Sequence, residues 1–534
     1  MDGDGELRAE FTDAATGRLR LCVTLTDLRL SVRKLGGSPV WQHGQEPVLE
    51  LGLGDCVGCR AWRSEDAEDT EDAAAYLCAY FYPVRRSWTG APAGRRREEQ
   101  RFRVLTGRDA RANLEQAERW ARAVTHRASA LRTPETRDSV KFGRVCVSRS
   151  VMVLVNPQSG RGQAMSLYTG PVLSMLSEAN ISHTLITTEH QNHAHELVRN
   201  ADLSQWSAIV ILSGDGLLFE VINGLMERED WDEAIRTPLG ILPGGSGNAL
   251  AASVHHYTQA GPALGEDLLL SCCFLLYKGP VCPLDIVSVR LSSGRRLFSF
   301  LSLAWGFVAD VDIESEKFRH VGAMRFLVGT LLRLASLRTY QGRLAFLPAR
   351  DDSDLASISS SPRSRFRQRQ SSNECATRNA IGDEFLLENE SKNDRLPDNL
   401  LNPVGDSVPS DWTVEKEQDF VLVLATCHSH LAEELMAAPD ARPDDGYLHL
   451  LYVTAGISRP ALLRLFLAME KGTHLTCECP HLMYQRVQAL RLEPITKPGV
   501  ITVDGEQVEY GPIQAQVAQG MWQDYMWMIP ILKT

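Results

Sequence analysis

The sequence predicts an α/β domain with a doubly wound parallel sheet, followed by a mainly antiparallel β domain and preceded by a smaller β module. Three observations support this prediction. Between residues 151 and 253, an apolar run, a glycine-rich turn and a helical pattern follow one another three times, and repeated βα units favour a parallel sheet. After residue 411, strand-like runs resume around a single strong helix, which suits antiparallel strands. Before residue 140, short alternating runs precede one helical pattern.

The composition is that of a globular protein. The chain has 534 residues, of which 44% are hydrophobic and 23% charged, and its formal net charge is −11. Phosphates repel a negative chain, so direct binding of nucleic acid is not expected. No transmembrane segment is expected either, because the most apolar stretch, residues 298–309, is shorter than the ~20 residues of a spanning helix. Contact with a membrane should therefore be peripheral.

The cysteines and the acidic start of the chain indicate a location. The twelve cysteines have no regular spacing, and MDGDGELRAE lacks the basic and then apolar pattern of a secretory signal. We expect reduced cysteines and a cytoplasmic protein, with the nucleus as the alternative.

The first 140 residues have the outline of a pleckstrin-homology-like module, several strands closed by one C-terminal helix. Strands are expected within residues 18–32 and 74–84, and the helix within residues 114–124. We interpret this region as one that interacts with lipid or membrane. One basic cluster should form a solvated loop, the alternatives being a nuclear-import signal and a lipid-headgroup patch; it comprises Arg95, Arg96, Arg97, Arg101 and Arg103.

Each of the three βα units has its glycine-rich turn directly after the predicted strand. The strands at residues 151–155, 208–212 and 239–242 are followed by NPQSGRG, SGDGL and PGGSGN. Backbone N–H groups at helix N-termini attract anions, and ligands lie at the carboxyl ends of parallel strands, so three such turns predict phosphate binding. Asp215, within the second turn, is either a helix cap or a carboxylate that accepts the proton of an attacking hydroxyl.

A charged segment emerges from an apolar run after residue 309. It contains Asp312, Glu316 and Arg319 at spacings of four and three, which would place all three on one helical face. One interpretation is a solvated helix with internal ion pairs. The other is a carboxylate at an apolar mouth, which suits a lipid with a cationic head, beside an arginine that suits phosphate.

Five segments resemble those of a known family. SGDGL, LPGGSGNALAAS, LSLAWGFVADVDIESEKFR, LLRLFLAMEKG and VDGEQVEYGP are similar to the sphingosine kinases, within the superfamily of diacylglycerol-kinase-type lipid kinases. The resemblance covers about residues 148–345 and 411–515, and the long N-terminal region and serine-rich insertion are most similar to the longer, type-2 members. It implies phosphorylation of the primary hydroxyl of sphingosine or dihydrosphingosine by ATP, with Mg²⁺ on the nucleotide phosphates.

The same resemblance implies roles for individual residues. Asp215 would be the general base, within a segment that faces both substrates and comprises Ser213, Gly214, Asp215 and Gly216. Asp312 would hold the amino-alcohol head of the lipid, with Ser302 nearby. The nucleotide would contact Asn156, Pro157, Gln158, Thr188, Glu189, His190, Gln191, Asn192, Glu220, Gly245, Ser246, Gly247, Arg319, Arg325, Asp504, Gly505 and Glu506.

These patterns and the resemblance predict four regions: an N-terminal module at 1–140, a catalytic α/β domain at 148–290, a β-rich lipid-binding domain at 291–350 and 411–534, and a disordered insertion at 351–410. The insertion has eleven serines and only two aromatic residues, too little apolar surface to fold alone. Two alternatives to a sphingosine kinase are a ceramide or acylglycerol kinase, whose substrate lacks the amine, and a catalytically inactive lipid-binding adaptor.

Overall fold

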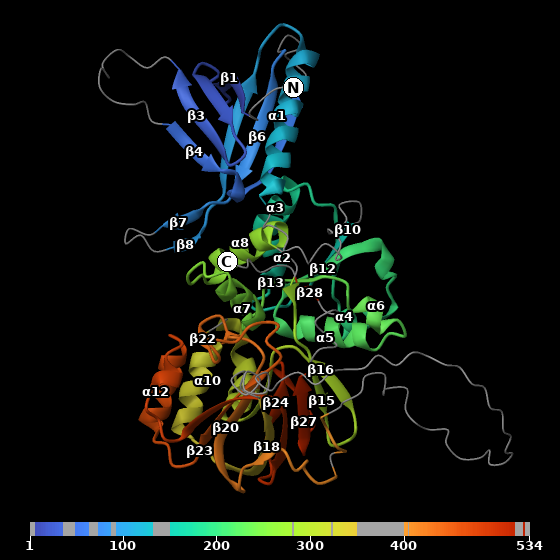
Figure 1. Ribbon diagram of the computed structural model, residues 1–534, viewed down its shortest axis with the longest axis vertical. Helices are drawn as coiled ribbons and strands as arrows, with labels where there is room; N and C mark the ends of the chain where they lie inside the picture. Colours follow the sequence, from blue (N-terminus) through green and yellow to red (C-terminus); the bar gives the residue numbers. More distant parts are fainter. Residues whose placement is uncertain are drawn as a thin grey trace, which may run out of the picture.

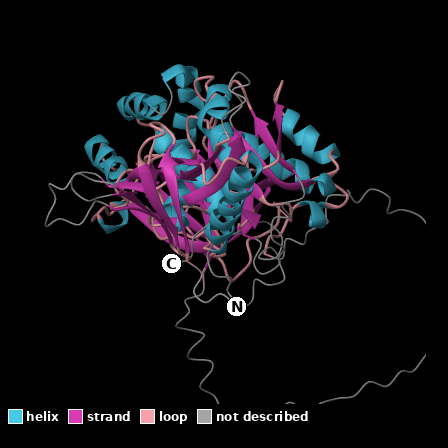
Figure 2. Cartoon of the chain, turned by 90° about the horizontal axis from the view of Figure 1, so that it is seen from above, coloured by secondary structure: helices cyan, strands magenta, loops and turns pink. Residues whose placement is uncertain are grey.

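The structure is a computed structural model in which residues 6–35, 48–63, 73–86, 92–131, 150–279, 282–321, 324–349, 400–403, 405–517 and 527–528 are described. Three groups of elements are stacked along its longest axis, with the N-terminal sheet at one end and the C-terminal strands at the other (Figure 1). Seen from above, the helices lie mostly around the outside of the strands (Figure 2). None of the helices in these ranges has the length and apolarity needed to span a membrane.

The N-terminal group is an antiparallel sheet of seven strands with one helix packed on it. The strand order is β4-β3-β2-β1-β9-β6-β5, and Trp120 of the helix meets Phe11 of the sheet edge to face at 5.2 Å. The elements are β1 (Leu7–Asp13), β2 (Arg20–Leu25), β3 (Arg29–Leu35), β4 (Val48–Gly52), η1 (Leu53–Asp55), β5 (Cys56–Arg63), β6 (Ala75–Phe81), β7 (Val84–Arg86), β8 (Pro92–Arg95), β9 (Glu98–Val104) and α1 (Ala110–Ala130).

The middle group contains the predicted parallel sheet. Strands β11, β10, β12 and β13 run parallel in that order, and the C-terminal strand β28 extends the sheet and pairs antiparallel with β14. The strands are β10 (Ser150–Val155), β11 (His183–Thr187), β12 (Trp206–Ser213), β13 (Leu239–Pro243), β14 (Cys282–Pro283) and β28 (Trp527–Met528). The helices are α2 (Ala164–Leu167), η3 (Tyr168–Val172), α3 (Leu173–Glu178), α4 (His193–Asn200), η4 (Leu203–Gln205), α5 (Asp215–Met226), α6 (Trp231–Ala234), α7 (Ala249–Tyr257) and α8 (Gly265–Lys278).

The third group is a large antiparallel sheet with helices on one side, together with a separate two-stranded sheet of residues 430–432 and 435–436. Trp305 lies in its core, against the rings of Tyr340 and Phe420. The strands are β15 (Val287–Arg290), β16 (Arg296–Ser299), β17 (Ser302–Gly306), β18 (Tyr340–Pro348), β19 (Thr413–Val414), β20 (Gln418–Thr426), β21 (His430–Ala432), β22 (Leu435–Met436), β23 (Leu448–Thr454), β24 (Leu482–Pro494), β25 (Ile501–Val503), β26 (Glu506–Gln507) and β27 (Ile513–Val517). The helices are α9 (Phe307–Ser315), η5 (Glu316–Val321), α10 (Met324–Ala335), α12 (Arg459–Met469) and η6 (His474–Thr476).

A polar contact attaches the N-terminal sheet to the middle group. Glu178, at the end of α3, is buried and accepts hydrogen bonds from the Tyr82 hydroxyl at 2.7 Å and from Arg97 Nε at 2.6 Å. The guanidinium of Arg95 lies over the ring of Phe274, 3.5 Å from its centre. The prediction of a solvated arginine loop is therefore wrong for Arg95, whose guanidinium packs against α8, and for Arg101 and Arg103, which lie in β9. Arg97 is exposed, as predicted, although it also binds Glu178.

The serine-rich insertion lies largely outside the described residues, which omit 351–399. Its predicted last part is described: Leu400, Leu401 and Val408 pack against a cluster around Trp412. The prediction of a disordered insertion is therefore kept only for residues 351–399, because the apolar side chains that follow them pack in a hydrophobic cluster.

Candidate active site

The glycine-rich turns meet at one edge of the parallel sheet. Val155, the last residue of β10, pairs with Thr187 of β11 and Leu212 of β12, while Ser213 of β12 pairs with Pro243 of β13. The chain therefore leaves all four strands at the same level. This register confirms the expectation that the turns after these strands lie side by side, where a ligand binds in an α/β sheet.

The turns approach each other so closely that their backbones touch. A Cβ atom built on Gly245 would lie 2.3 Å from the Gly214 Cα, and one built on Gly160 would lie 2.8 Å from the Gly244 carbonyl oxygen. The Ser159 hydroxyl also accepts a hydrogen bond from the Gly214 N–H at 3.1 Å. Glycine is required at these positions because any side chain would separate the three turns.

Asp215 joins the starts of two helices. It is the first residue of α5, and its two carboxylate oxygens accept hydrogen bonds from the Ala249 N–H at 2.9 Å and the Leu250 N–H at 3.1 Å, both in the first turn of α7. The helix-cap interpretation of Asp215 is thus confirmed, although the helix that it caps is α7 rather than its own. Burial raises the pKa of Asp215 above its ordinary value, and the nearby Glu433 carboxylate raises it further, against the lowering effect of the backbone N–H groups.

Glu433 is a site residue that the sequence analysis missed. It lies between β21 and β22, and its carboxylate accepts a hydrogen bond from Asn248 Nδ2 at 2.6 Å. Asn248 in turn accepts a hydrogen bond from the Gly245 N–H at 2.8 Å. No local pattern marks a single glutamate in a strand turn, so only its spatial neighbours identify it.

The Asp-Gly-Glu hairpin also reaches the glycine-rich turns. Asp504 is buried and accepts hydrogen bonds from the Ser299 hydroxyl at 2.6 Å and from the backbone N–H groups of residues 300–302 at 2.8–3.0 Å. Burial raises the pKa of Asp504 to about 6 in spite of these bonds. Across Gly505, the Glu506 carboxylate lies against the second turn, 2.7 Å from a Cβ built on Gly216.

The predicted nucleotide contacts that follow β10 and β11, together with Glu220 of α5, have local roles in the chain. Glu220 accepts a hydrogen bond from the Ala194 N–H at 3.2 Å, in the first turn of α4. Asn192 precedes that helix in the left-handed region at φ 64°, and Asn156 accepts a hydrogen bond from the Gln158 N–H at 2.9 Å. The remaining predicted contacts in these turns follow β10 or β11 directly: Pro157, Thr188, Glu189, His190 and Gln191.

Asp312 is half-buried on α9, and the predicted common helical face extends to Glu316 but not to Arg319. Helix α9 ends at Ser315, and Glu316 caps it with helical geometry at φ −57° and ψ −34°, so these two carboxylates stay one turn apart. Phe318 then leaves helical geometry at φ −103° and ψ 19°, which interrupts the helix before Arg319. The Arg319 side chain lies outside the described residues.

Arg325, on α10 beyond the kink at Phe318, is an arginine that acts electrostatically on Asp312. It forms an ion pair with Glu316 at 3.9 Å, and the ring of its neighbour Phe326 lies 3.9 Å from a Cβ built on Gly247. Burial raises the pKa of Asp312 to about 7, opposed by Arg325 and assisted by Glu316. The lipid-head and nucleotide candidates are thus close to the third glycine-rich turn.

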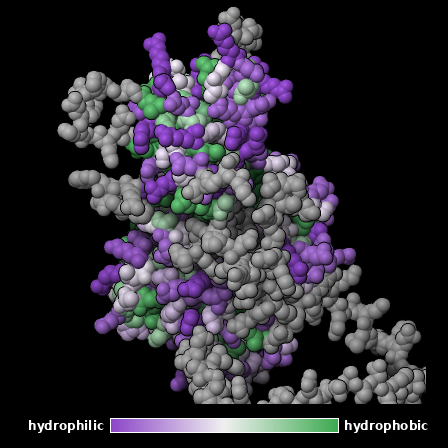
Figure 3. Space-filling view, turned by 45° about the horizontal axis from the view of Figure 1, so that its top comes forward, coloured by the Kyte–Doolittle hydropathy of each residue, from purple (hydrophilic) through white to green (hydrophobic). Residues whose placement is uncertain are grey.

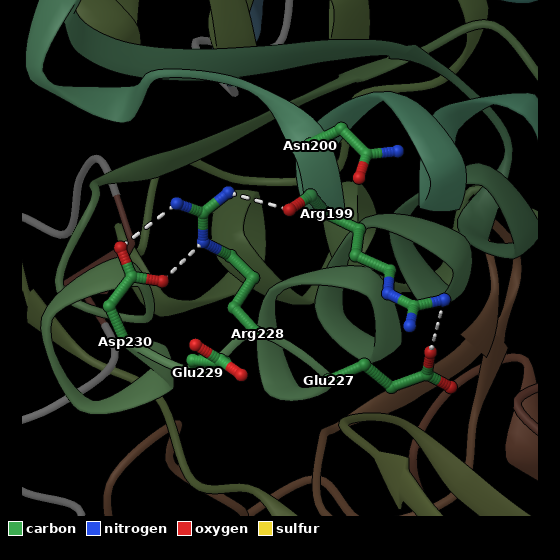
Figure 4. A pocket seen from close by; sticks show the side chains of 6 residues that line it. All are labelled: Arg199, Asn200, Glu227, Arg228, Glu229 and Asp230. Atoms are coloured by element: carbon green, nitrogen blue, oxygen red, sulfur yellow. Dashed lines mark hydrogen bonds and ion pairs between the residues drawn. The ribbon is translucent and has the colours of Figure 1, made fainter.

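A separate surface cavity of about 440 Å³ lies at the far ends of α4 and α5 (Figure 4). Its charges are paired with one another: Arg228 binds both oxygens of Asp230 at 2.7 and 2.9 Å, and Arg199 lies 3.5 Å from Glu227. Asp215 begins α5 whereas this cavity follows its last residue, about 17 Å away along the helix. The cavity therefore does not belong to the candidate site.

Comparison with known proteins gives family matches over most of the chain. The diacylglycerol kinase catalytic domain matches residues 150–272, and the YegS C-terminal NAD kinase beta sandwich-like domain matches residues 408–523. Sphingosine kinase 2 of Homo sapiens is 40% identical over 96% of this chain and 90% of that protein, and sphingosine kinase 1 of Homo sapiens is 48% identical over 71% and 90%. Sphingosine kinase 1 of Arabidopsis thaliana is 35% identical over 70% and 72%.

The contact between the second and third turns can be tested with one methyl group. Gly245→Ala places a Cβ atom 2.3 Å from the Gly214 Cα, so the turns must separate. We expect ATP binding, measured by isothermal titration, to weaken by about tenfold or more. Gly170→Ala is the control, because a Cβ there meets no atom within 4 Å. Equal ATP affinities of the two variants would contradict this account of the site.

Proposed function

The chain belongs to the sphingosine kinase family, and from this premise we propose how its own residues perform the reaction. As a lipid kinase it uses ATP to phosphorylate sphingosine. We propose that the primary hydroxyl of sphingosine or dihydrosphingosine attacks the γ-phosphate of ATP beside Asp215. The observation that carries this proposal is the position of that carboxylate, held where the glycine-rich turns meet.

Asp215 is proposed as the base. A carboxylate has about four acceptor positions, so the two N–H groups from α7 leave capacity for the substrate hydroxyl. An aspartate is too weak a base to deprotonate an alcohol beforehand, even with a raised pKa. The proton should therefore pass to Asp215 late, as the bond to phosphorus forms.

ATP is proposed to lie over the glycine-rich turns, with its phosphates toward the N-termini of α5 and α7, whose N–H groups and dipoles favour anions. The residues present also suit Mg²⁺, which proteins bind through one or two carboxylates together with substrate phosphates. Glu506, beside Gly216, would supply such a carboxylate. When bound, Mg²⁺ neutralises charge on the phosphates. The Asp504 carboxylate already accepts hydrogen bonds from residues 299–302. We therefore propose that Asp504 positions this hairpin rather than contacting the nucleotide.

The lipid is proposed to bind with its ammonium at Asp312 and its tail among apolar side chains of α9, α10 and α12. Phe307 and Phe466 stack at 5.2 Å within this apolar cluster. Ser302 begins β17, and its backbone N–H donates to the Asp504 carboxylate at 2.8 Å, which supports a role for Ser302 beside this hairpin. A cationic head suits Asp312, whereas ceramide and acylglycerols lack the charge that this carboxylate would bind.

Contact with a membrane is proposed to occur through α10. Leu327, Leu331 and Leu332 on this helix are 42–51% exposed, and Leu467 on α12 is 46% exposed. Hydrophobic patches also interrupt the polar surface elsewhere (Figure 3). Membrane docking at this helix would place the tail-binding cluster beside the bilayer that supplies the substrate. We accordingly propose a cytoplasmic enzyme that associates peripherally with membranes, the nucleus being the alternative.

The domain assignments are proposals of the same kind. The single helix α1 on an antiparallel sheet supports a pleckstrin-homology-like module for residues 1–140. The parallel sheet supports a catalytic domain at 148–290, and the antiparallel sheet supports a lipid-binding domain at 291–350 and 411–534. Two strands depart from these bounds: β28 belongs to the parallel sheet, and β15, at 287–290, belongs to the antiparallel sheet.

The role of Asp215 is tested by Asp215→Asn. We expect turnover of sphingosine to fall by about a hundredfold or more, because the amide cannot accept the proton, while ATP affinity changes little. Transfer of labelled phosphate to sphingosine, with ceramide and diacylglycerol in parallel, measures both the reaction and its specificity. Wild-type turnover in this variant would remove Asp215 as the base.

The role of Asp312 predicts a pH dependence. With a pKa of about 7 in the free protein, its carboxyl group is ionised above that pH and protonated below it, and only the ionised form attracts the ammonium. The KM for sphingosine should therefore rise several-fold as the pH falls from about 8 to about 6. Asp312→Asn should have a high KM at both values; a parallel pH dependence in both enzymes would count against the assignment.

Membrane docking is tested by replacing Leu331 and Leu332 together with glutamate. Removing apolar contact and adding charge should reduce sedimentation with phosphatidylcholine–phosphatidylserine vesicles several-fold. Val414→Glu is the control, because Val414 is 60% exposed on another element, β19. If the double variant sediments like this control, α10 is not the docking element.

A further inference from the structure

Glu433, between β21 and β22, forms two hydrogen bonds to the third glycine-rich turn and one to the start of α8. Its backbone N–H donates to the Gly247 carbonyl at 2.9 Å. One carboxylate oxygen accepts from Asn248 Nδ2 at 2.6 Å, and the other accepts from the Gly265 N–H at 3.2 Å. Asn248 is 185 residues away along the chain, so this is a tertiary contact rather than a local turn.

The Glu433 carboxylate and the Gly245 backbone together orient the Asn248 amide. An ionised carboxylate only accepts hydrogen bonds, so the NH₂ end of Asn248 must face it. The same NH₂ group donates to the Gly245 carbonyl at 3.1 Å, and Oδ1 accepts from the Gly245 N–H at 2.8 Å. Asn248 has φ 54° and precedes α7, so its orientation fixes the turn from which that helix starts.

The start of α7 is also where Asp215 is held. The N–H groups of Ala249 and Leu250, the two residues after Asn248, donate to the Asp215 carboxylate. A chain of hydrogen bonds therefore runs from Glu433 through Asn248 and the first turn of α7 to Asp215. The Glu433 charge also acts on Asp215 through space.

We propose that Glu433 is a positioning residue for phosphoryl transfer, whose carboxylate fixes the Asn248 amide and thereby the helix start that holds Asp215. This inference rests on the proposed function, because it assumes that Asp215 is the base. Glu433 touches neither reacting group in this account, and it acts through Asn248.

The test is Glu433→Gln, which keeps the size of the side chain. Glutamine offers one oxygen and one NH₂ group, whereas Asn248 Nδ2 and the Gly265 N–H both require an acceptor. One of the two bonds must fail, and the negative charge is lost. We expect kcat to fall about tenfold, with the KM for sphingosine nearly unchanged. The acidic limb of kcat should also move to lower pH, because removing the charge lowers the pKa of Asp215. The substitution leaves the Glu506 carboxylate, which lies against the second turn, in place.

Two further variants make the result decisive. Glu434→Gln is the matched control, since Glu434 is the next residue, carries the same charge and is exposed; it should behave as the wild type. Glu433→Asp retains the charge and should keep the wild-type acidic limb even where kcat falls. A Glu433→Gln enzyme with wild-type kcat, or with reduced kcat and an unmoved acidic limb, overturns the inference. An active Asp215→Asn enzyme would instead refute the proposed function, so the two failures are distinguishable.

Discussion

The direct backbone contact between Gly214 and Gly245 is the constraint on which the rest of the site depends. Because neither residue has a side chain, the ends of β12 and β13 can bring two helix starts within reach of one carboxylate. Asp215 then satisfies two N–H groups of α7, which would otherwise lack partners at a helix N-terminus. The same packing directs two helix dipoles toward one place, which supports the proposal that ATP phosphates bind there.

Burial makes the ionised form of three carboxylates in the site less favourable. Asp215, Asp312 and Asp504 each have a raised pKa, and burial is the largest cause in every case. Adding the phosphates of ATP to these carboxylates costs electrostatic energy unless cations enter with them. Magnesium and the arginine at position 325 would meet this need, while the N–H groups on Asp215 keep that carboxylate fixed in place.

The residues of the candidate site come from separate sheets. Asp504 organises residues 299–302, which join β16 and β17 of the antiparallel sheet, and Glu433 reaches from the separate β21–β22 pair to the third glycine-rich turn. The active site is therefore completed only when these sheets are packed together. The N-terminal module is attached on another side, through the buried Glu178, so it contributes to the assembly without lining the site.

The sequence by itself determined the three βα units and their glycine-rich turns, because strand periodicity and turn composition are local properties. It also identified Asp215 as a cap or base, and the family resemblance supplied the roles. The end of α9 at Ser315, the partners of Arg95 and Arg97 and the position of Glu433 were decided only by tertiary structure. Each depends on contacts between residues far apart in the chain, which spacing along a sequence cannot encode.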